Sequence, residues 1–358
     1  MKKILIFGYT MQMGGAEKAL SDTLNYLKDF CEIDLYLLEP TGSLMNNIPK
    51  DVTVHKLKKN IFHYILFRFI PFYRKFVINT IANKKNYYAA LGYMEGRCGT
   101  WVADINKKIK KIAWIHNDVS KFNIGISEKE IRNTYSKLDR VICVSKQAKD
   151  IFCKKYNISK KKVDVIYNFI NEEEILKKAE EYKIKNDVYT FVNVAKMRDQ
   201  KRQDRLVYAA KYLKELNYKF KIQLIGDGPN LEKITNLVNE LEVNDRVEIL
   251  GLKTNPYPYI KSADFFVLSS YMEGYGIVVK EALLLKTKVL TTDITGPKEI
   301  LEDGKFGIIV PNDDNSLKYK MKEILDNKEK FKLYDKILFK YKGDNEEIKK
   351  QTLNLLDI

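Results

Sequence analysis

Short apolar runs alternate with amphipathic stretches along almost the whole chain. Apolar runs of this length are typical of strands buried on both faces of a sheet. They predict strands at 3–8, 33–38, 52–57, 89–92, 111–115, 140–144, 163–166, 189–195, 221–226, 247–250, 265–269, 289–292 and 307–310. The stretches between them predict helices at 16–28, 145–156, 204–215, 230–241, 277–285 and 316–325. Alternating strands and helices indicate an α/β fold with parallel sheets.

The alternation is interrupted once, by a polar and charged stretch at 167–186. We therefore place a domain boundary there and expect a first domain at 1–170 and a second at 187–328. The last segment, 329–358, is helical by pattern, and we expect it to dock toward the first domain. In open parallel sheets, ligands bind at the carboxyl ends of strands. Residues directly after the predicted strands are therefore the candidates for a functional site.

Composition narrows the class of protein. The chain has 358 residues, of which 45% are hydrophobic, which is enough for two domains with their own cores. The net charge of +16 favours an anionic partner: a phosphorylated substrate, an anionic lipid surface or nucleic acid. The four cysteines form no CxxC pair and suit a reducing cytosol. No uninterrupted apolar run reaches the roughly 20 residues of a membrane span.

Two features of the first half follow predicted strands. Gly14 and Gly15 come between strand 3–8 and a helix, where a bare backbone can approach a ligand and free N–H groups can bind an anion. The pair does not match GxGxxG, and an ordinary turn would also explain it. His116 follows strand 111–115, and an imidazole can exchange a proton near neutral pH. A loop histidine bonded to Asp118 is the alternative.

A cluster of cations follows strand 189–195: Lys196, Arg198, Lys201 and Arg202. Four positive charges at a strand end can neutralise a diphosphate, whereas a solvated basic loop is the plainer alternative.

The most informative motif follows strand 265–269. Glu273 lies in a loop before Gly274 and Gly276, and Glu281 lies two turns into the helix that starts near Gly276. Glycines at a helix start expose N–H groups to phosphate or sugar oxygens. Glu281 is placed to accept hydrogen bonds from a ribose, and Glu273 from hydroxyls of a transferred sugar. An acidic residue between a buried strand and a Gly-x-Gly turn has no packing purpose.

In this order, the residues resemble glycosyltransferase family 4 over nearly the whole chain. Gly14-Gly15 resembles the family's early glycine loop, and His116 its histidine near the donor sugar. Lys196 and Lys201 resemble its basic pair, and Glu273 and Glu281 its two-glutamate motif. The chain departs from the pattern at Ala195-Lys196, where the family usually has Gly-Arg, and at Asn168-Phe169, where it usually has Asn-Gly.

The resemblance implies the GT-B fold, in which two Rossmann-like doubly wound domains face each other across a cleft. It implies retaining, metal-independent transfer of a hexose-type sugar from a UDP- or GDP-sugar, without a cofactor or a protein nucleophile. His116 and Glu273 would be catalytic residues. The donor would be bound by Gly14, Gly15, Lys196, Lys201, Gly274, Tyr275, Gly276, Ile277, Val278 and Glu281.

Residues 52–94 contain no Asp or Glu and combine Lys and Arg with many aromatic residues. Such a stretch can lie in the interface of an anionic membrane, and we expect Arg68, Arg74 and Lys75 to face it. A core helix with a solvated basic edge is the alternative. The membrane interpretation favours a saccharide acceptor linked to polyprenyl diphosphate, used for capsular or other cell-surface polysaccharide. It places the protein in the cytoplasm, peripheral to the inner face of the membrane.

Four other functions are alternatives at this point. A nucleotide-sugar epimerase or glycoside phosphorylase shares the GT-B fold and the donor site, and a transferase-like subunit without activity shares the fold. A nucleic-acid-binding protein is suggested by the charge. In that case the basic residues should form one stripe with stacking aromatics. They are instead scattered over many Lys-rich helices, so we expect no nucleic-acid partner.

Overall fold

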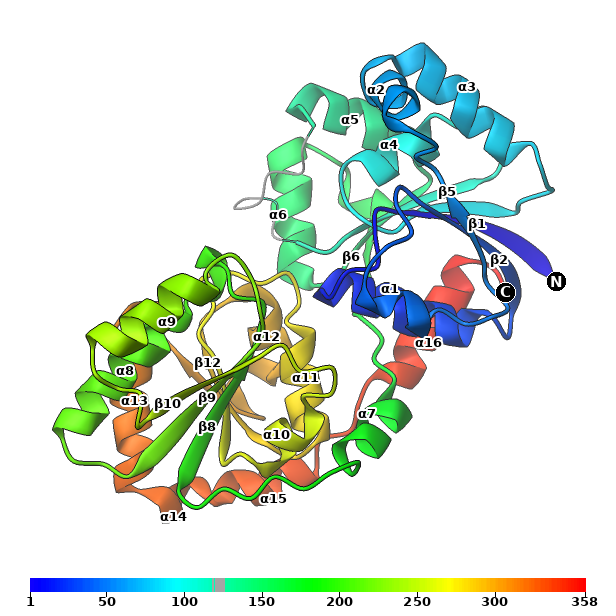
Figure 1. The fold of residues 1–358 in the computed structure, drawn as a ribbon. Coiled ribbons are helices and arrows are strands. Elements are labelled where there is room, and N and C mark those ends of the chain that lie inside the picture. The colour runs from blue at the N-terminus through cyan, green and yellow to red at the C-terminus, as the bar shows by residue number, and fades with distance from the viewer. Residues whose placement is uncertain (118, 120–125) are drawn as a thin grey trace. The chain divides into compact units, whose positions relative to one another are not determined.

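The computed structural model describes residues 1–117, 119 and 126–358. The chain forms two compact units (Figure 1). Unit 1 contains Met1–Ile170 and Asp344–Ile358, and unit 2 contains Asn171–Gly343. Each unit has one sheet whose neighbouring strands all run parallel. The predicted class, α/β with two doubly wound domains, is confirmed.

The sheet of unit 1 has the order β3-β2-β1-β4-β5-β6-β7. Its strands are β1 (Lys2–Gly8), β2 (Cys31–Leu37), β3 (Thr53–Lys56), β4 (Ala89–Gly92), β5 (Lys110–Ile115), β6 (Arg140–Cys143) and β7 (Val163–Val165). The direction of winding reverses between β1 and β4, because the chain first builds outward from β1 to β3 and then returns. Loops that follow β1, β4 and β5 therefore meet at the same edge of the sheet.

The helices of unit 1 cover both faces of its sheet. They are α1 (Gly15–Leu27), α2 (Ile61–Phe69), α3 (Pro71–Ala82), α4 (Arg97–Ala103), α5 (Glu128–Ser136), α6 (Lys146–Tyr156) and α16 (Asn345–Leu355), with 3-10 turns η1 (Ser43–Asn47) and η2 (Lys160–Lys162). α1 and α16 lie on one face, and α3, α4 and α5 on the other (Figure 1). α16 is held by the buried side chains of Ile348 and Leu356, and Asn345 Nδ2 donates to the Ile170 carbonyl at 2.7 Å.

The sheet of unit 2 has the order β10-β9-β8-β11-β12-β13. Its strands are β8 (Tyr189–Val194), β9 (Phe220–Ile225), β10 (Val247–Gly251), β11 (Phe265–Leu268), β12 (Lys288–Thr292) and β13 (Ile308–Val310). The winding reverses between β8 and β11, so the loops after these two strands lie next to each other. That reversal is the place where this class of sheet binds ligands.

Unit 2 is likewise covered on both faces, by α8, α9 and α13 on one and by α10 and α11 on the other (Figure 1). Its helices are α7 (Glu172–Ala179), α8 (Gln203–Glu215), α9 (Leu231–Glu240), α10 (Tyr257–Ser262), α11 (Ile277–Leu284), α12 (Thr295–Ile300), α13 (Ser316–Asp326), α14 (Lys328–Phe331) and α15 (Leu333–Phe339), with 3-10 turns η3 (Asp199–Lys201) and η4 (Glu302–Gly304). The core between β-sheet and α8 includes Phe191, Leu206 and Leu224, all fully buried.

All the predicted strands are present within two residues of their expected bounds. The helices were predicted less completely. The polar stretch 167–186 contains α7, and the aromatic stretch 52–94 contains the helix pair α2 and α3. Within the described residues, no helix combines the length and the apolar character needed to cross a membrane.

Candidate active site

The two motifs of unit 2 lie side by side at the reversal of the sheet. One follows β8 and the other follows β11. The backbone N–H of Tyr271 donates to the Gln200 carbonyl at 2.7 Å, and Ser269 Oγ donates to the Lys201 carbonyl at 2.8 Å. These bonds fix the loop of cations against the loop that carries Glu273.

Lys201 and Glu273 form an ion pair across these loops. Lys201 Nζ donates to both carboxylate oxygens of Glu273, at 2.5 and 2.7 Å, and Ser270 Oγ donates to one of them at 2.6 Å. Glu273 is 9% exposed and the Lys201 side chain 18%. A carboxylate that accepts three hydrogen bonds in a largely buried setting is held in one orientation. The structure therefore brings together two residues that lie far apart in the sequence.

The other three cations of the cluster differ in what they bind. Arg202 donates to both carboxylate oxygens of Asp204 and also to Asp314, at distances of 2.7 to 3.1 Å. Lys196 and Arg198 have no side-chain hydrogen bond or ion pair with any residue that the structure describes. The positive charge left for an anionic ligand is therefore that of Lys196 and Arg198.

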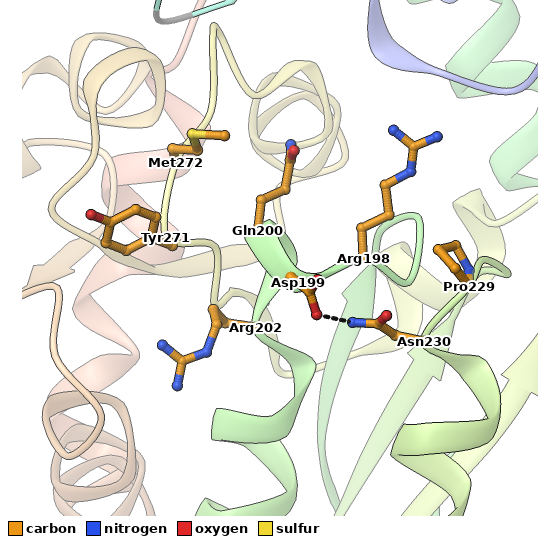
Figure 2. A pocket seen from close by; sticks show the side chains of 8 residues that line it. All are labelled: Arg198, Asp199, Gln200, Arg202, Pro229, Asn230, Tyr271 and Met272. Atoms are coloured by element: carbon orange, nitrogen blue, oxygen red, sulfur yellow. Dashed lines mark hydrogen bonds between the residues drawn. The ribbon is translucent and has the colours of Figure 1, made fainter. Parts of the chain in front are cut away.

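A pocket of about 600 Å³ opens beside these loops (Figure 2). Its lining is formed by Arg198, Asp199, Gln200, Arg202, Pro229, Asn230, Tyr271 and Met272. Figure 2 shows that Arg198 and Arg202 point away from each other. Asn230 Nδ2 donates to Asp199 at 2.8 Å, which ties the start of α9 to the cation loop. Sequence reasoning missed Asn230, because the turn before α9 reads as purely structural.

The Gly-Tyr-Gly turn before α11 has a fixed conformation. Gly276 has φ +82°, and a Cβ there would come within 2.8 Å of Pro297. A Cβ on Gly296 would come within 2.3 Å of the Tyr275 backbone, so α12 packs directly against the turn. The first N–H groups of a helix have no acceptor within it, and they include those of Ile277 and Val278. Gly274 lies in the same turn.

Glu281 occupies the second turn of α11 and is 5% exposed. Tyr257 Oη, from α10, donates to its carboxylate at 3.2 Å. The carboxylate is therefore buried and accepts at least one hydrogen bond, while its contact with a ribose stays a prediction.

In unit 1, Gly14 and Gly15 form the start of α1. Gly14 precedes the helix in an extended conformation with φ −169°, so its backbone does not require glycine. An added Cβ would instead meet the Glu17 carboxylate at 2.3 Å. The glycine leaves room for that side chain above the helix N-terminus.

His116 lies at the end of β5 and is 6% exposed. Its Nε2 is 2.8 Å from the Tyr93 carbonyl, which can only accept, so Nε2 carries the proton. Nδ1 has no partner among the described residues. Burial lowers the pKa of His116, although the charge of Glu95 and the bond to Tyr93 oppose the shift. The imidazole is therefore neutral at pH 7, with Nδ1 as a buried acceptor.

The loop that carries His116 is held by Glu95, which sequence reasoning missed. One Glu95 oxygen accepts from the His116 backbone N–H at 3.1 Å, and the other accepts from the Asn117 amide. Glu95 follows β4 closely, so its place just after a buried strand was the available signal. The alternative partner considered for His116, Asp118, lies outside the described residues.

Family models match both halves of the chain. The model described as "Glycosyltransferase Family 4" matches residues 13–174, and the model described as "Glycosyl transferases group 1" matches residues 174–337. The chain belongs to the family 4 glycosyltransferases.

This glycosyltransferase also resembles individual proteins over its whole length. It is 28% identical to the N-acetylgalactosamine-N,N'-diacetylbacillosaminyl-diphospho-undecaprenol 4-alpha-N-acetylgalactosaminyltransferase of Campylobacter jejuni, over 93% of each chain. Among solved structures, Anabaena Alr3699/HepE in complex with UDP superimposes with a TM-score of 0.75, at 17% identity and 100% of both chains. Sucrose-phosphate synthase from Thermosynechococcus elongatus has a TM-score of 0.78 at 17% identity, over 100% of this chain and 98% of that one. These likenesses show the GT-B fold.

The glycosyltransferase places the three expected membrane-facing cations differently. Arg68 and Lys75 are exposed, and the Arg68 guanidinium lies 5.4 Å from the Phe69 ring. Arg74 is buried, and its Nε donates to Asp104 at 2.6 Å. The prediction that Arg74 faces a membrane is therefore wrong, because its charge is neutralised inside unit 1.

As for metals, no group of three or more His, Cys, Asp or Glu residues in the described chain is arranged to hold one.

Proposed function

We propose that this glycosyltransferase is a retaining enzyme that moves a hexose-type sugar from a UDP- or GDP-sugar to a saccharide acceptor. The observation that carries the proposal is the oriented Glu273 carboxylate, held by Lys201 beside the N-terminus of α11. A diphosphate needs positive charge and N–H donors, while a sugar needs fixed acceptors for its hydroxyls. Unit 2 offers both kinds of group at one sheet edge. The UDP bound by the Anabaena neighbour supports a nucleotide ligand.

In the proposed reaction, the bond between the anomeric carbon and the donor diphosphate breaks. The acceptor oxygen attacks the same face, and the departing phosphate oxygen takes the acceptor's proton. Lys196, Arg198 and the N–H groups at the start of α11 stabilise the negative charge that grows on the diphosphate. Glu273 accepts hydrogen bonds from hydroxyls of the transferred sugar, and so does the neutral Nδ1 of His116. Glu281 accepts from the ribose.

We further propose that the acceptor saccharide is linked to polyprenyl diphosphate and that the protein works at the inner face of the cell membrane in cell-surface polysaccharide synthesis. The name of the Campylobacter relative describes a saccharide on diphospho-undecaprenol as its acceptor. The basic, acid-free stretch 52–94 supports an anionic partner of this kind.

The direct test is to incubate the protein with a panel of UDP- and GDP-sugars and acceptors and to determine the product anomer by NMR. We expect the donor's α or β configuration to be kept, and activity to survive EDTA. Inversion would contradict the retaining mechanism, and loss of activity in EDTA would contradict metal independence. Conversion of the donor to an epimer without any acceptor would identify an epimerase instead.

The diphosphate assignment predicts a selective loss of affinity in Lys196→Ala. Charge-assisted hydrogen bonds contribute about 1.5–3 kcal/mol, so UDP or GDP should bind about 10–100-fold more weakly. The free nucleoside should bind as it does to the wild type, since it lacks the diphosphate. Isothermal titration calorimetry measures both.

Lys219→Ala is the matched control for this variant. Lys219 is an exposed lysine of the same unit, but it precedes β9 and so lies at the opposite, amino-terminal edge of the sheet. It should leave both affinities unchanged. Equal losses for diphosphate and nucleoside in Lys196→Ala would show that Lys196 does not contact phosphate.

A further inference from the structure

Helix α2 is apolar on both sides, which is unusual for a helix at the surface of a unit. Its inward side carries His63 and Phe67, which are buried. Phe67 packs against Trp101 of α4 with ring centroids 5.5 Å apart. Its outward side nevertheless carries Ile61, Phe62, Ile65 and Phe69, all exposed. Helices that are apolar all round are normally buried, so this outward side is suited to a partner.

The exposed apolar side continues onto α3. Phe72 and Phe76 of α3 are exposed, as is Ile70 between the two helices, and Phe72 reaches 83%. We call these seven residues, Ile61, Phe62, Ile65, Phe69, Ile70, Phe72 and Phe76, the hairpin face. Single exposed apolar residues are common, but seven between positions 61 and 76, four of them phenylalanines, indicate an interaction surface.

The orientation of α3 is fixed by polar contacts with the segment that follows α4, and Arg74 lies on the side of α3 opposite Phe72 and Phe76. Arg74 pairs with Asp104, Asn79 Nδ2 donates to the Asp104 carbonyl at 2.9 Å, and the Asn106 backbone N–H donates to Asn79 Oδ1 at 2.7 Å. Rotating α3 to bury its phenylalanines would break this cluster and leave buried charges unpaired. The aromatic rings therefore stay in contact with solvent in the isolated unit.

The charged residues close to the hairpin face in the sequence are all positive. Lys59, Arg68 and Lys75 are exposed, and residues 52–94 contain no acidic residue. Two copies of this surface would bring like charges together, which disfavours self-association. Anionic lipid headgroups attract such cations, while aromatic and aliphatic side chains enter the boundary between headgroups and acyl chains.

We propose that the hairpin face is a membrane anchor whose side chains insert into the interface of an anionic bilayer. This deepens the proposed work at the membrane and rests on that proposal, since it names the residues that bind the bilayer, in a part of unit 1 that contains none of the proposed catalytic or donor-binding residues. Because the attachment combines apolar insertion with charge, salt should weaken it without abolishing it.

Phe72→Trp gives a direct probe of insertion. The native tryptophans, Trp101 and Trp114, are buried at 2% and 4% exposure, so a tryptophan at position 72 would supply the solvent-sensitive signal. With vesicles of phosphatidylglycerol and phosphatidylcholine, we expect its emission to shift to the blue and to be quenched by lipids brominated on the acyl chains. The matched control is Phe339→Trp in α15 of unit 2, since Phe339 is also 83% exposed. It should show neither effect.

Substituting two phenylalanines of the hairpin face tests the same surface by loss of vesicle binding. Phe69→Ser with Phe72→Ser should weaken binding to these vesicles at least about tenfold in sedimentation. The reason is that moving each phenylalanine side chain from water into the bilayer interface lowers the free energy of the bound state. Phe339→Ser should bind as the wild type does. UDP or GDP affinity should be unchanged in both, so a failure of the anchor is distinguishable from a failure of the proposed function.

Two results would overturn the proposal. One is the absence of bromolipid quenching in Phe72→Trp together with unchanged sedimentation of the double serine variant. The other is a dimer in light scattering without lipid, in which the emission of the new tryptophan is already shifted to the blue. The second result would show that another copy of the chain covers the hairpin face.

Discussion

Glu273→Ala is expected to lower kcat by about 10²–10³-fold, the range seen when one preorganised polar contact to a transition state is removed. The reason is the orientation of the carboxylate, which Lys201 and Ser270 fix before any ligand binds. A group that needs no reorganisation stabilises the transition state more than a mobile one does. Affinity for the nucleoside diphosphate should rise by no more than a few fold, because the proposed partner of Glu273 is the sugar and the substitution also frees the charge of Lys201.

The measurement is steady-state kinetics of sugar transfer together with calorimetric binding of UDP or GDP. Retained nucleotide binding also reports that unit 2 remains folded. Glu302→Ala is a suitable control, since Glu302 is an exposed glutamate of unit 2 that pairs with Lys305. A kcat for Glu273→Ala close to that of the control would remove Glu273 from the catalytic residues.

The Lys201–Glu273 ion pair also determines how much of the positive charge of the cation cluster is available to a ligand. Because Glu273 neutralises Lys201, and Asp204 and Asp314 neutralise Arg202, the cluster has less free charge than its sequence suggests. Glu273→Gln should separate the two roles of this residue. It keeps an acceptor oxygen for the sugar but frees the charge of Lys201, so diphosphate affinity should rise while kcat falls less than in Glu273→Ala.

Much of the fold followed from the sequence for a physical reason. Parallel strands buried on both faces must be continuously apolar, so short apolar runs located β1 to β13 within two residues. Because parallel strands all end at one edge, residues after strands were the candidates, and the structure brings two of them, Lys201 and Glu273, together. The pairing of Lys201 with Glu273 was not predictable, since it depends on which strands become neighbours.

Sequence patterns did not predict helix α2 or the partners of His116. α2 has apolar residues on both sides, so no stripe marks it as a helix. His116 was made a candidate by its place after β5, but its partners, Tyr93 and Glu95, come from the loop that follows β4. Only the order of the sheet, in which β4 pairs with β5, brings them together.

Arg74 and Lys75 show why a basic stretch cannot be treated as one surface. They are adjacent and equally charged, yet Arg74 is buried and Lys75 is exposed. Arg74 shares the inward side of α3 with Ile78 and Ile81 at helical spacing. That spacing was a usable signal, because consecutive residues of a helix point in different directions.

This difference predicts opposite outcomes for two similar substitutions. Arg74→Ala should lower the free energy of unfolding of unit 1 by about 3–5 kcal/mol, because it leaves the buried Asp104 carboxylate without its cation. Lys75→Ala should change it by no more than about 0.5 kcal/mol, as is usual at exposed positions. Urea unfolding followed by tryptophan fluorescence measures this selectively, since Trp101 and Trp114 both belong to unit 1.

Replacing both partners, as Arg74→Met with Asp104→Leu, should restore most of the loss, since no unpaired charge then remains buried. Equal stability of Arg74→Ala and Lys75→Ala would mean that the Arg74–Asp104 pair does not hold α3 in place, and the rigid presentation of the hairpin face would then lose its support.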